Sequence, residues 1–474
     1  MDNWEVVPLG HHGSEVLAIH AALLADGRVA YFSGSEHNAD QHNAGDVDHS
    51  RIWDPRTNVI STIPSPAHDL FCCGHAFLGD GRLLVAGGTK TYDYLGLKET
   101  TVFDGRVLPP QNPWIPGPNM AGGRWYPTLV TLPDGTVVVV SGVLDEPVPP
   151  PVNVAVEVFA THPPPGVWNH VGDQPDMPAG YPRMHLLPDG QVLSSTPMAG
   201  VCRVWSPITL NWLDAGPGPG AEYVSYNTTA VLLPLRPEEG YRARVMVAGT
   251  AQPQIFDLAA PEDGWQATAA RALHGSPVRN HACSVLLPDA TVVVVSGSRT
   301  QADADGVREA EIYEPATGHW SVGAAAAVPR VYHNVALLLP DGRVWTAGSN
   351  HDGAQGHSEL RMEVYEPDYL SRGPGPEITA APVSISVPVG FPTSASFEIA
   401  SPQAPSIASA ALLRCGSITH AFDADQRYVG LAIRSRTTGT VTVAYPPTAE
   451  IAPPGAYFLF VVDANGVPSI GRPV

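Results

Sequence analysis

The sequence has little charge, few cysteines and no long apolar run. Only 15% of its 474 residues are charged, and together they give a net charge of −20. Because excess acidic groups repel phosphate backbones and anionic lipid surfaces, a nucleic-acid partner is not expected. No stretch approaches the roughly 20 consecutive apolar residues of a membrane helix, so no membrane span is predicted. Residues 1–14 lack the basic start and apolar run of a signal peptide.

The five cysteines exclude a disulfide framework, because such frameworks are dense and even-numbered in small secreted domains. At least one cysteine must stay unpaired. Cys202, Cys283 and Cys415 are expected to be small buried apolar residues. Cys72 and Cys73 stand next to each other in a motif that is described below.

Glycine and proline are abundant instead, with 46 and 49 residues. Together with many valines they indicate short strands and frequent turns rather than long helices. A chain of this length is too long for one ordinary core, which favours several domains or a large repeat. The predicted class is all-β.

An internal repeat defines the architecture. An apolar run, a turn and a second apolar run recur about every 50 residues. The turns are Asp26-Gly27, Asp80-Gly81, Asp134-Gly135, Asp189-Gly190, Asp289-Ala290 and Asp341-Gly342, with a longer one around Glu239-Gly240. An Asp-Gly pair between apolar strands predicts a two-residue hairpin, since glycine tolerates positive φ. The count of units is seven.

Aromatic residues form a second register with the same count. One set comprises Trp53, Phe103, Phe159, Trp205, Phe256, Tyr313 and Tyr365, and tryptophans follow several of them at Trp114, Trp168, Trp212, Trp265 and Trp320. The last unit lacks such a tryptophan, and Trp4 stands where it would be needed. The pattern resembles kelch repeats, which build four-stranded blades. We therefore predict a seven-bladed kelch-type β-propeller over residues 1–372, with its N-terminal strand closing the last blade.

The repeat stops after Leu370, and a proline- and glycine-rich stretch follows. Alternating segments such as 396–399 and 441–445 then indicate several short strands. Their number and spacing predict an immunoglobulin-like β-sandwich domain over residues 377–474.

Four short motifs carry residue types suited to chemistry. They are Phe71-Cys72-Cys73-Gly74-His75, Arg124-Trp125-Tyr126-Pro127, Pro329-Arg330-Val331-Tyr332-His333-Asn334 and Ile418-Thr419-His420. Cys72, Tyr126 and Tyr332 each lie eight or nine residues before a turn aspartate, at the start of equivalent strands. Because equivalent positions of a propeller converge on its axis, we expect these side chains to meet.

Two histidines and two tyrosines offer the nitrogen and oxygen donors that suit Cu(II). Zinc is less favoured, because its catalytic sites rarely use two tyrosines. Tyr332 and His333 are neighbours, and side chains alternate in a regular strand. Both can face one metal only if the start of that strand is distorted.

The four motifs resemble those of the copper radical oxidases, the family of galactose oxidase and, more closely, glyoxal oxidase. The resemblance extends to Asp423–Arg427 and Pro453–Phe460 and covers nearly the whole chain. It implies that Tyr126 is an equatorial copper ligand joined to Cys72 by a thioether bond. Tyr332 would be the axial ligand, and His333 and His420 the remaining ones. His420 would reach the site from the C-terminal domain.

The resemblance also implies the reaction. Copper and the crosslinked Cys72–Tyr126 radical cofactor would oxidise small primary alcohols or aldehydes with O2, giving the aldehyde or acid and H2O2. Tyr332 would act as general base, and Tyr126 would take hydrogen from the substrate carbon. The expected protein is a monomer that is secreted or attached to the cell envelope, with an intracellular form as the alternative.

Some features depart from the pattern or stay open. The propeller is expected to begin directly, without a preceding carbohydrate-binding domain, which disfavours polymeric sugars. Trp125 and Tyr226 are candidates for the aromatic cover of the Tyr-Cys pair, although Trp125 would point away from Tyr126 in a regular strand. Cys73 leaves the choice of sulfur open, with Cys72 favoured by the repeat. A histidine-rich segment is expected to be a solvated connection and contains His37, His42 and His49.

Two other functions are considered. A kelch propeller can be a non-catalytic scaffold that binds a protein partner, which would not need the five site residues together. A propeller hydrolase or lyase acting on sugars would need paired carboxylates in the channel. The acids that can be placed lie mostly in turns and outer strands, which makes the hydrolase the weaker alternative.

Overall fold

The computed structural model describes residues 2–9, 13–35, 50–91, 94–107, 111–220, 225–273, 278–300, 302–350, 358–387 and 395–474. Within these ranges the chain forms strands and short 3-10 helices and no α-helix, which confirms the all-β prediction. The 3-10 helices are Ser225–Asn227, Pro237–Glu239, Pro261–Asp263, Asp303–Asp305, Asp368–Ser371 and Ala404–Ser406. None of the helices described is long and apolar enough to cross a bilayer.

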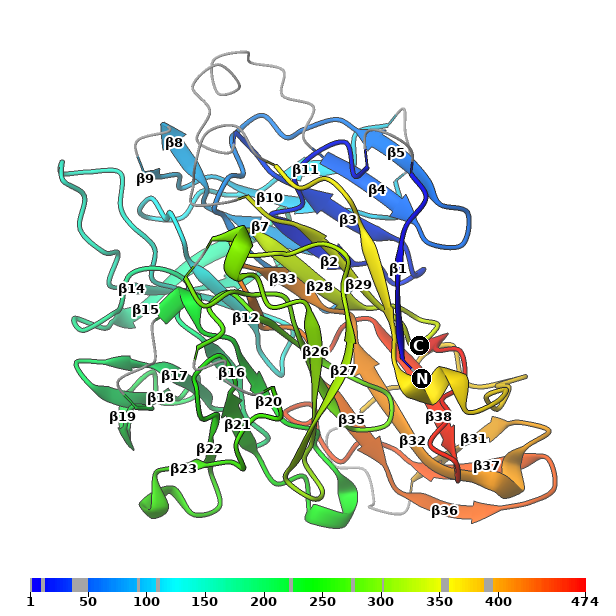
Figure 1. Ribbon diagram of the computed structural model, residues 1–474. Coiled ribbons are helices and arrows are strands. Elements are labelled where there is room, and N and C mark those ends of the chain that lie inside the picture. Colours follow the sequence, from blue (N-terminus) through cyan, green and yellow to red (C-terminus); the bar gives the residue numbers. More distant parts are fainter. Residues whose placement is uncertain are drawn as a thin grey trace.

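Up to residue 371 the described strands form seven sheets that contain four blade strands each and lie around a common centre, besides one two-stranded hairpin (Figure 1). Their strands are β2 (His20–Leu23), β3 (Val29–Phe32), β4 (Ser50–Asp54), β5 (Val59–Ile63); β6 (Gly74–Phe77), β7 (Leu83–Ala86), β10 (Thr100–Phe103), β11 (Trp114–Pro116); β12 (Thr128–Thr131), β13 (Val137–Val140), β14 (Ala155–Ala160), β15 (Val167–Asp173); β16 (Met184–Leu186), β17 (Val192–Met198), β18 (Val201–Trp205), β19 (Trp212–Pro217); β20 (Ala230–Leu232), β21 (Arg244–Val247), β22 (Gln254–Asp257), β23 (Trp265–Ala267); β24 (Cys283–Leu286), β25 (Val292–Val295), β26 (Glu309–Glu314), β27 (His319–Ala325); β28 (Asn334–Leu338), β29 (Val344–Gly348), β30 (Glu363–Glu366) and β1 (Asn3–Val6). A further hairpin pairs β8 (Thr89–Thr91) with β9 (Leu95–Gly96). The sheets agree with the predicted propeller, whose count of seven blades and limits at residues 1–372 stay predictions.

The hairpins at the turn aspartates differ from the predicted two-residue type. In the first one Gly27 has φ of 86°, whereas Asp26 is not among the residues with positive φ. The hydrogen bonds Gly27 N to Leu24 O and Leu24 N to Arg28 O enclose a three-residue loop ending in a left-handed residue. The Asp26 carboxylate accepts the Arg28 backbone N–H, which fixes the turn locally. Equivalent turns follow Asp80, Asp134, Asp189, Asp289 and Asp341.

The two aromatic registers correspond to two neighbouring strands. In six sheets an aromatic residue of the third strand pairs directly with a tryptophan, as in Phe103↔Trp114 and Tyr313↔Trp320. The sixth of these pairs is Trp4↔Tyr365, formed by β1 and β30. Strands from both ends of the propeller chain therefore share one sheet, and each pair buries a large apolar area at the outer part of its blade.

The C-terminal region forms two packed sheets. One contains β31 (Ser396–Ala400), β37 (Thr440–Ala444) and β36 (Ile433–Arg436), and the other β35 (Tyr428–Leu431), β32 (Ile407–Arg414), β38 (Tyr457–Asp463) and β39 (Arg472–Pro473). This is the predicted sandwich, and its limits at residues 377–474 stay a prediction. A hairpin of β33 (Ser417–Thr419) and β34 (Phe422–Asp423) leaves it and joins the first propeller sheet beside β2 (Figure 1).

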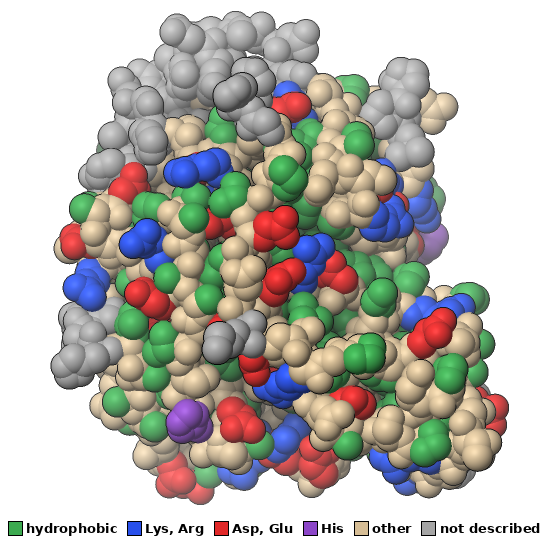
Figure 2. Space-filling view, turned by 45° about the vertical axis from the view of Figure 1, so that its right-hand side comes forward, with side chains coloured by type: hydrophobic (Ala, Val, Ile, Leu, Met, Phe, Trp, Pro, Cys, Tyr) green, Lys and Arg blue, Asp and Glu red, His purple; other side chains and the backbone are tan. Residues whose placement is uncertain are grey.

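The surface mixes charges of both signs. On the face shown in Figure 2, acidic and basic side chains lie interspersed among neutral and apolar ones. Several turn aspartates are paired locally with an arginine two residues later, as in Asp26–Arg28 and Asp80–Arg82. The acidic excess is therefore not gathered into one patch on this face.

Candidate active site

Four of the predicted site residues lie just before a strand begins, His420 lies in the turn between β33 and β34, and the backbone at these positions is unusual. Cys72, Tyr126, His333 and His420 all have positive φ, between 47° and 68°. Residues other than glycine rarely adopt this conformation, and such positions cluster at functional sites. At Tyr332-His333 the distortion brings two neighbouring rings to the same side, with centroids 3.7 Å apart. The predicted distortion of this strand start is confirmed.

Buried arginines hold these strand starts. Arg124, two residues before Tyr126, donates to the carbonyl groups of Ser141 and Ala155 and pairs with Glu157 at 2.8 Å. Arg330, two residues before Tyr332, pairs in the same way with Glu363 at 3.4 Å. All four charged side chains of these pairs are at most 2% exposed. Because each guanidinium group donates to two backbone carbonyls as well as pairing with a buried carboxylate, each clamp fixes the backbone beside a tyrosine.

The predicted side chains converge. The hydroxyl groups of Tyr126 and Tyr332 are in hydrogen-bond contact, and His420 Nε2 lies 3.1 Å from the Tyr126 hydroxyl oxygen. Ligand atoms of Cys72, His333 and His420 lie within 4.8 Å of one another, and all three residues are buried. Residues more than 200 positions apart in the sequence thus meet at one point.

The donor set fits a metal. His333 uses Nδ1 for a 2.8 Å hydrogen bond with Asn350, and His420 uses Nδ1 for a 2.7 Å hydrogen bond with Thr419. This arrangement fixes both rings, so that Nε2 is the nitrogen that would bind a metal, as is usual for metal-binding histidines. Two imidazoles and two phenols within contact distance suit Cu(II) better than Zn(II) or Mg²⁺.

Burial disfavours charge on the phenols and the thiol. It raises the pKa of Tyr126 well above the ordinary value, and the nearby Cys72 and Tyr332 add to the effect. Burial likewise raises the pKa of Tyr332 and of Cys72. Neither tyrosine can become a phenolate at neutral pH unless a cation compensates the lost hydration, which agrees with a metal site.

The two adjacent cysteines face different surroundings. The Cys72 backbone carbonyl accepts a 2.9 Å hydrogen bond from the Tyr126 N–H, and its sulfur belongs to the cluster with His333 and His420. Cys73 instead places its sulfur 3.9 Å from Nδ1 of His20. The other three cysteines are buried, as predicted. The geometry therefore favours Cys72 as the partner of Tyr126.

The Tyr126 ring lies between aromatic neighbours. Trp125 stacks on it with centroids 3.9 Å apart and an interplanar angle of 17°, and Tyr181 stacks at 4.6 Å and 28°. Tyr226 meets it edge-on at 5.8 Å. The expectation that Trp125 would point away is wrong, because positive φ at Tyr126 breaks the alternation of a regular strand.

Two residues near the site were missed by the sequence analysis. Tyr181 and His281 both have positive φ and lie against the tyrosines of the site. Each stands eight residues before a turn aspartate, Asp189 or Asp289, which is the offset of Cys72 and Tyr126. The same rule, applied to every repeat, would have found them. The histidines His37, His42 and His49 lie outside the described residues.

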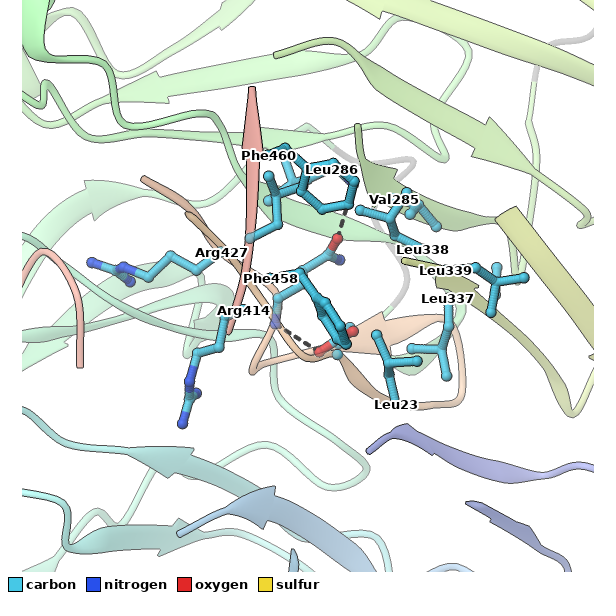
Figure 3. Close-up of a pocket in the computed structure, with 15 residues that line it drawn as sticks. Leu23, Val285, Leu286, Leu337, Leu338, Leu339, Arg414, Arg427, Phe458 and Phe460 are labelled. Carbon is cyan, nitrogen blue, oxygen red and sulfur yellow. Dashed lines mark hydrogen bonds between the residues drawn. The ribbon is translucent and has the colours of Figure 1, made fainter. Parts of the chain in front are cut away.

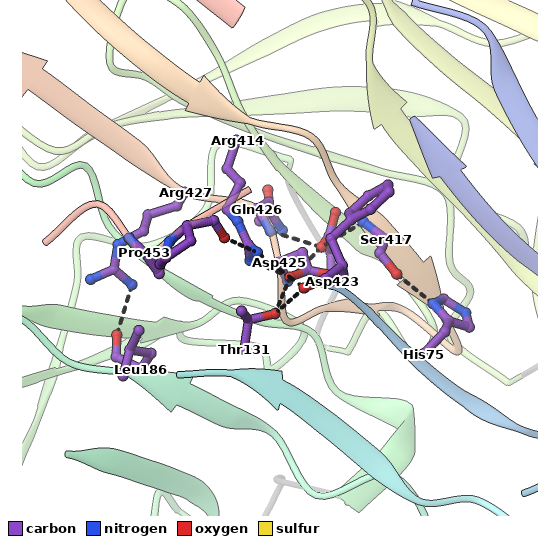
Figure 4. Close-up of polar contacts among 12 residues, drawn as sticks. His75, Thr131, Leu186, Arg414, Ser417, Asp423, Asp425, Gln426, Arg427 and Pro453 are labelled. Carbon is purple, nitrogen blue, oxygen red and sulfur yellow. Dashed lines mark hydrogen bonds and ion pairs between the residues drawn. The ribbon is translucent and has the colours of Figure 1, made fainter. Parts of the chain in front are cut away.

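The hairpin that carries His420 is held by a buried polar network (Figure 4). Asp425 pairs with Arg414 and accepts the Phe77 backbone N–H at 2.8 Å. Asp423 Oδ1 accepts backbone N–H groups of Ser417, Asp425 and Gln426. The network joins the sandwich to the second sheet of the propeller and fixes the direction of the hairpin.

Beside this hairpin the sandwich and the propeller enclose a small, mostly apolar pocket (Figure 3). Leu337 and Val285 line it from the propeller, and Phe458 and Phe460 from the sandwich. The Gln426 side chain connects the hairpin region to strand β24 by two hydrogen bonds. Its oxygen accepts the Leu286 backbone N–H, and its nitrogen donates to the Ser284 carbonyl. The pocket is part of the interface, and it lies apart from the tyrosines of the site.

Asp423 gives a testable pH dependence. Burial raises the pKa of this carboxyl group to about 7, so the folded chain holds a proton that the unfolded chain releases. The contribution of the protonated Asp423 carboxyl group to the free energy of unfolding is fully present below the ordinary aspartate pKa. This contribution is lost as the pH rises through about 7. Asp423→Asn keeps an oxygen for the three N–H groups without a charge, and we expect it to stabilise the protein by about 1–3 kcal/mol above pH 7. Urea unfolding of both proteins across pH 4–8 checks this, and parallel curves would contradict it.

Comparison with known proteins places the chain in a family. Residues 26–369 match the family described as Glyoxal oxidase N-terminus, and residues 376–474 match Galactose oxidase-like, Early set domain. Galactose oxidase of Gibberella zeae is 26% identical over 97% of this chain and 68% of its own length. Aldehyde oxidase GLOX of Vitis pseudoreticulata is 29% identical over 90% of this chain and 85% of its own length.

The fold comparison agrees. A fungal alcohol oxidase solved in complex with copper superimposes with a TM-score of 0.79, covering 100% of this chain and 98% of the other, at 22% identity. At that identity the likeness supports the fold alone. Since one family match spans most of the chain and a second covers the sandwich, the chain belongs to the copper radical oxidase family of glyoxal oxidase and galactose oxidase.

Proposed function

We propose that the protein is a mononuclear copper radical oxidase that converts small primary alcohols or aldehydes, with O2, to the aldehyde or acid and H2O2. The observation that carries the proposal is the convergence of Tyr126, Tyr332 and His420, with Cys72 and His333 beside them, at one buried point. Family membership favours an oxidase over the non-catalytic kelch scaffold.

Copper would be held by Tyr126, Tyr332, His333 and His420, which are the residues that meet in the site. When bound together with an oxidised tyrosine, copper supplies a centre that accepts two electrons from one substrate molecule. The histidines are oriented for this role by Asn350 and Thr419. His420 comes from the sandwich, so both parts of the chain contribute ligands.

The second part of the cofactor would be a thioether between Cys72 and Tyr126. Its formation joins the sulfur to a ring carbon next to the hydroxyl-bearing one and removes the thiol hydrogen and one ring hydrogen. O2 takes up these two electrons and two protons and becomes H2O2. Sulfur substitution makes the phenol easier to oxidise, and the stacked rings of Trp125 and Tyr181 shield the modified residue from water.

The chain's own residues would then divide the work on the substrate. Tyr332 accepts the proton of the substrate hydroxyl group, because its oxygen lies at the centre of the site. Tyr126 accepts a hydrogen atom from the adjacent carbon. The substrate would lose two protons and two electrons in all, because a proton goes to Tyr332, a hydrogen atom goes to Tyr126, and one further electron remains that bound copper could accept. O2 would then take up the two protons and two electrons and become H2O2. An aldehyde would react through its hydrate, which presents the same O–H and C–H groups.

Intact mass of the copper-loaded protein tests the proposal. We expect wild type to lose about two mass units on aerobic copper loading and to release H2O2 with a small alcohol or aldehyde. Cys72→Gly should do neither. Cys73→Ala is the matched control and should keep the mass loss. An unchanged mass without H2O2 would leave a kelch scaffold and overturn the oxidase proposal.

Export from the cytoplasm and a monomeric state remain predictions. Size-exclusion chromatography with light scattering tests the latter directly.

A further inference from the structure

His281 occupies a position that the chain elsewhere gives to site residues. It stands eight residues before Asp289, as Tyr126 stands eight residues before Asp134. Its φ of 59° is close to the 68° of Tyr126. His281 and Tyr126 therefore share the left-handed backbone conformation and the same position in their repeats.

The clamp before His281 is also the same. Arg279, two residues earlier, pairs with Glu311 at 2.6 Å and donates to the carbonyl groups of Ser296 and Glu309. Both charged side chains are fully buried. Among the described sheets, those that carry Tyr126, Tyr332 and His281 share this arginine–glutamate clamp. Burying an ion pair costs desolvation free energy, and the chain repeats such a pair beside His281 as it does beside Tyr126 and Tyr332.

The surroundings of His281 point to a missing hydrogen-bond partner. Its ring lies 4.9 Å from that of Tyr332 and 6.0 Å from that of Tyr226. The side chain is 1% exposed, and neither ring nitrogen has a hydrogen-bond partner among the residues that the structure describes. Buried polar groups are nearly always paired, so an unpaired one in a site indicates a ligand.

The chemistry of the imidazole ring limits what that ligand can be. A neutral imidazole offers one N–H donor and one acceptor nitrogen. A hydroxyl group, which is both donor and acceptor, matches it better than a carboxylate or an ammonium group.

We propose that His281 binds a second hydroxyl group of the substrate, next to the one whose proton Tyr332 accepts. This inference rests on the proposed oxidase function and names its substrate class. Preferred substrates carry two oxygens on the reacting carbon or on neighbouring carbons, namely hydrated aldehydes, 1,2-diols and hydroxyaldehydes. His281 then selects these over simple alcohols, while Tyr126 and Tyr332 perform the oxidation.

Ethane-1,2-diol and ethanol are a matched substrate pair, differing by one hydroxyl group. His281→Phe keeps a ring of similar size without nitrogens, and His281→Gln restores a donor and an acceptor. We expect His281→Phe to lower the kcat/KM ratio of diol to ethanol by about 10- to 100-fold, mainly through KM for the diol. His281→Gln should recover part of that ratio. An equal loss for both substrates would overturn the proposal and leave His281 a packing residue.

Binding can be followed without turnover. In copper-free protein with ¹⁵N-labelled histidine, the His281 resonances are identified by their loss in His281→Phe. Ethane-1,2-diol should shift them, whereas ethanol at equal concentration should shift them much less. Absence of a diol-specific shift would contradict the proposal. If wild type neither binds copper nor releases H2O2, the oxidase function fails, and the resonance shifts still decide whether His281 binds a diol.

Discussion

Tyr332→Phe is expected to lower kcat by about a hundred- to ten-thousandfold, the usual range for loss of a positioned general base. The substitution removes one oxygen and keeps the ring that packs on His333 and His281. Arg330 and its clamp with Glu363 do not touch that oxygen, so the strand start should keep its shape. The loss should therefore be chemical rather than structural.

Peroxide release at saturating substrate measures this loss, together with copper content and the mass change on loading. Tyr313→Phe removes a hydroxyl group from an outer strand and serves as control, with kcat within about twofold of wild type. If Tyr332→Phe binds copper, forms the crosslink and turns over at a similar rate, Tyr332 is not the base. A variant that fails to form the crosslink would place Tyr332 in cofactor assembly instead, against the assigned role.

Arg414→Met should destabilise the protein by about 3–5 kcal/mol. Arg414 and Asp425 are at most 3% exposed, and Arg414 also donates to the Pro454 carbonyl at 3.1 Å. Without the guanidinium group, Asp425 would be a buried carboxyl group with no cation beside it. Because Asp425 holds the Phe77 N–H, the loss also loosens the hairpin that presents His420.

The midpoint of urea unfolding and the copper dissociation constant are the two measurements. Asp425→Asn added to Arg414→Met should recover part of the stability, since the uncompensated charge is then gone. The exposed pair Arg372–Asp368 provides the control, and Arg372→Met should change stability by less than about 1 kcal/mol. An effect of Arg414→Met no larger than this control would show that the pair is dispensable.

Much of the fold could be predicted because its signals are local and repeated. In each three-residue loop the turn aspartate accepts the backbone N–H of the residue two positions later. This hydrogen bond is present at six turns, although the sequences of the flanking strands differ. The pairing of Trp4 with Tyr365 spans the whole propeller, yet the missing tryptophan of the last unit indicated it. The turn type itself was predicted wrongly, because Asp-Gly also fits a loop in which glycine alone has positive φ.

The site was predictable only where a resemblance or a repeat offset singled out a residue. The stacking of Trp125 on Tyr126 depends on one backbone angle that no residue pattern shows. Tyr181 and His281 carry the offset but are ordinary residue types for a buried strand start. The hairpin at His420 depends on the contacts of Asp425 with Arg414 and with Phe77. Phe77 is more than 300 residues away from Asp425 in the sequence, so no local pattern indicates this contact.

The pairing of β33 with β2 also has a consequence in time. Thr419 donates to the Ile19 carbonyl across 400 positions of the chain, so β2 has no β33 beside it until the C-terminal region is synthesised. At roughly 5–20 residues per second, a ribosome needs on the order of 20–80 s after β2 to synthesise β33. During that interval β2 presents an open edge to other nascent strands. His420 emerges equally late, so the proposed copper site can be completed only after synthesis has reached the sandwich.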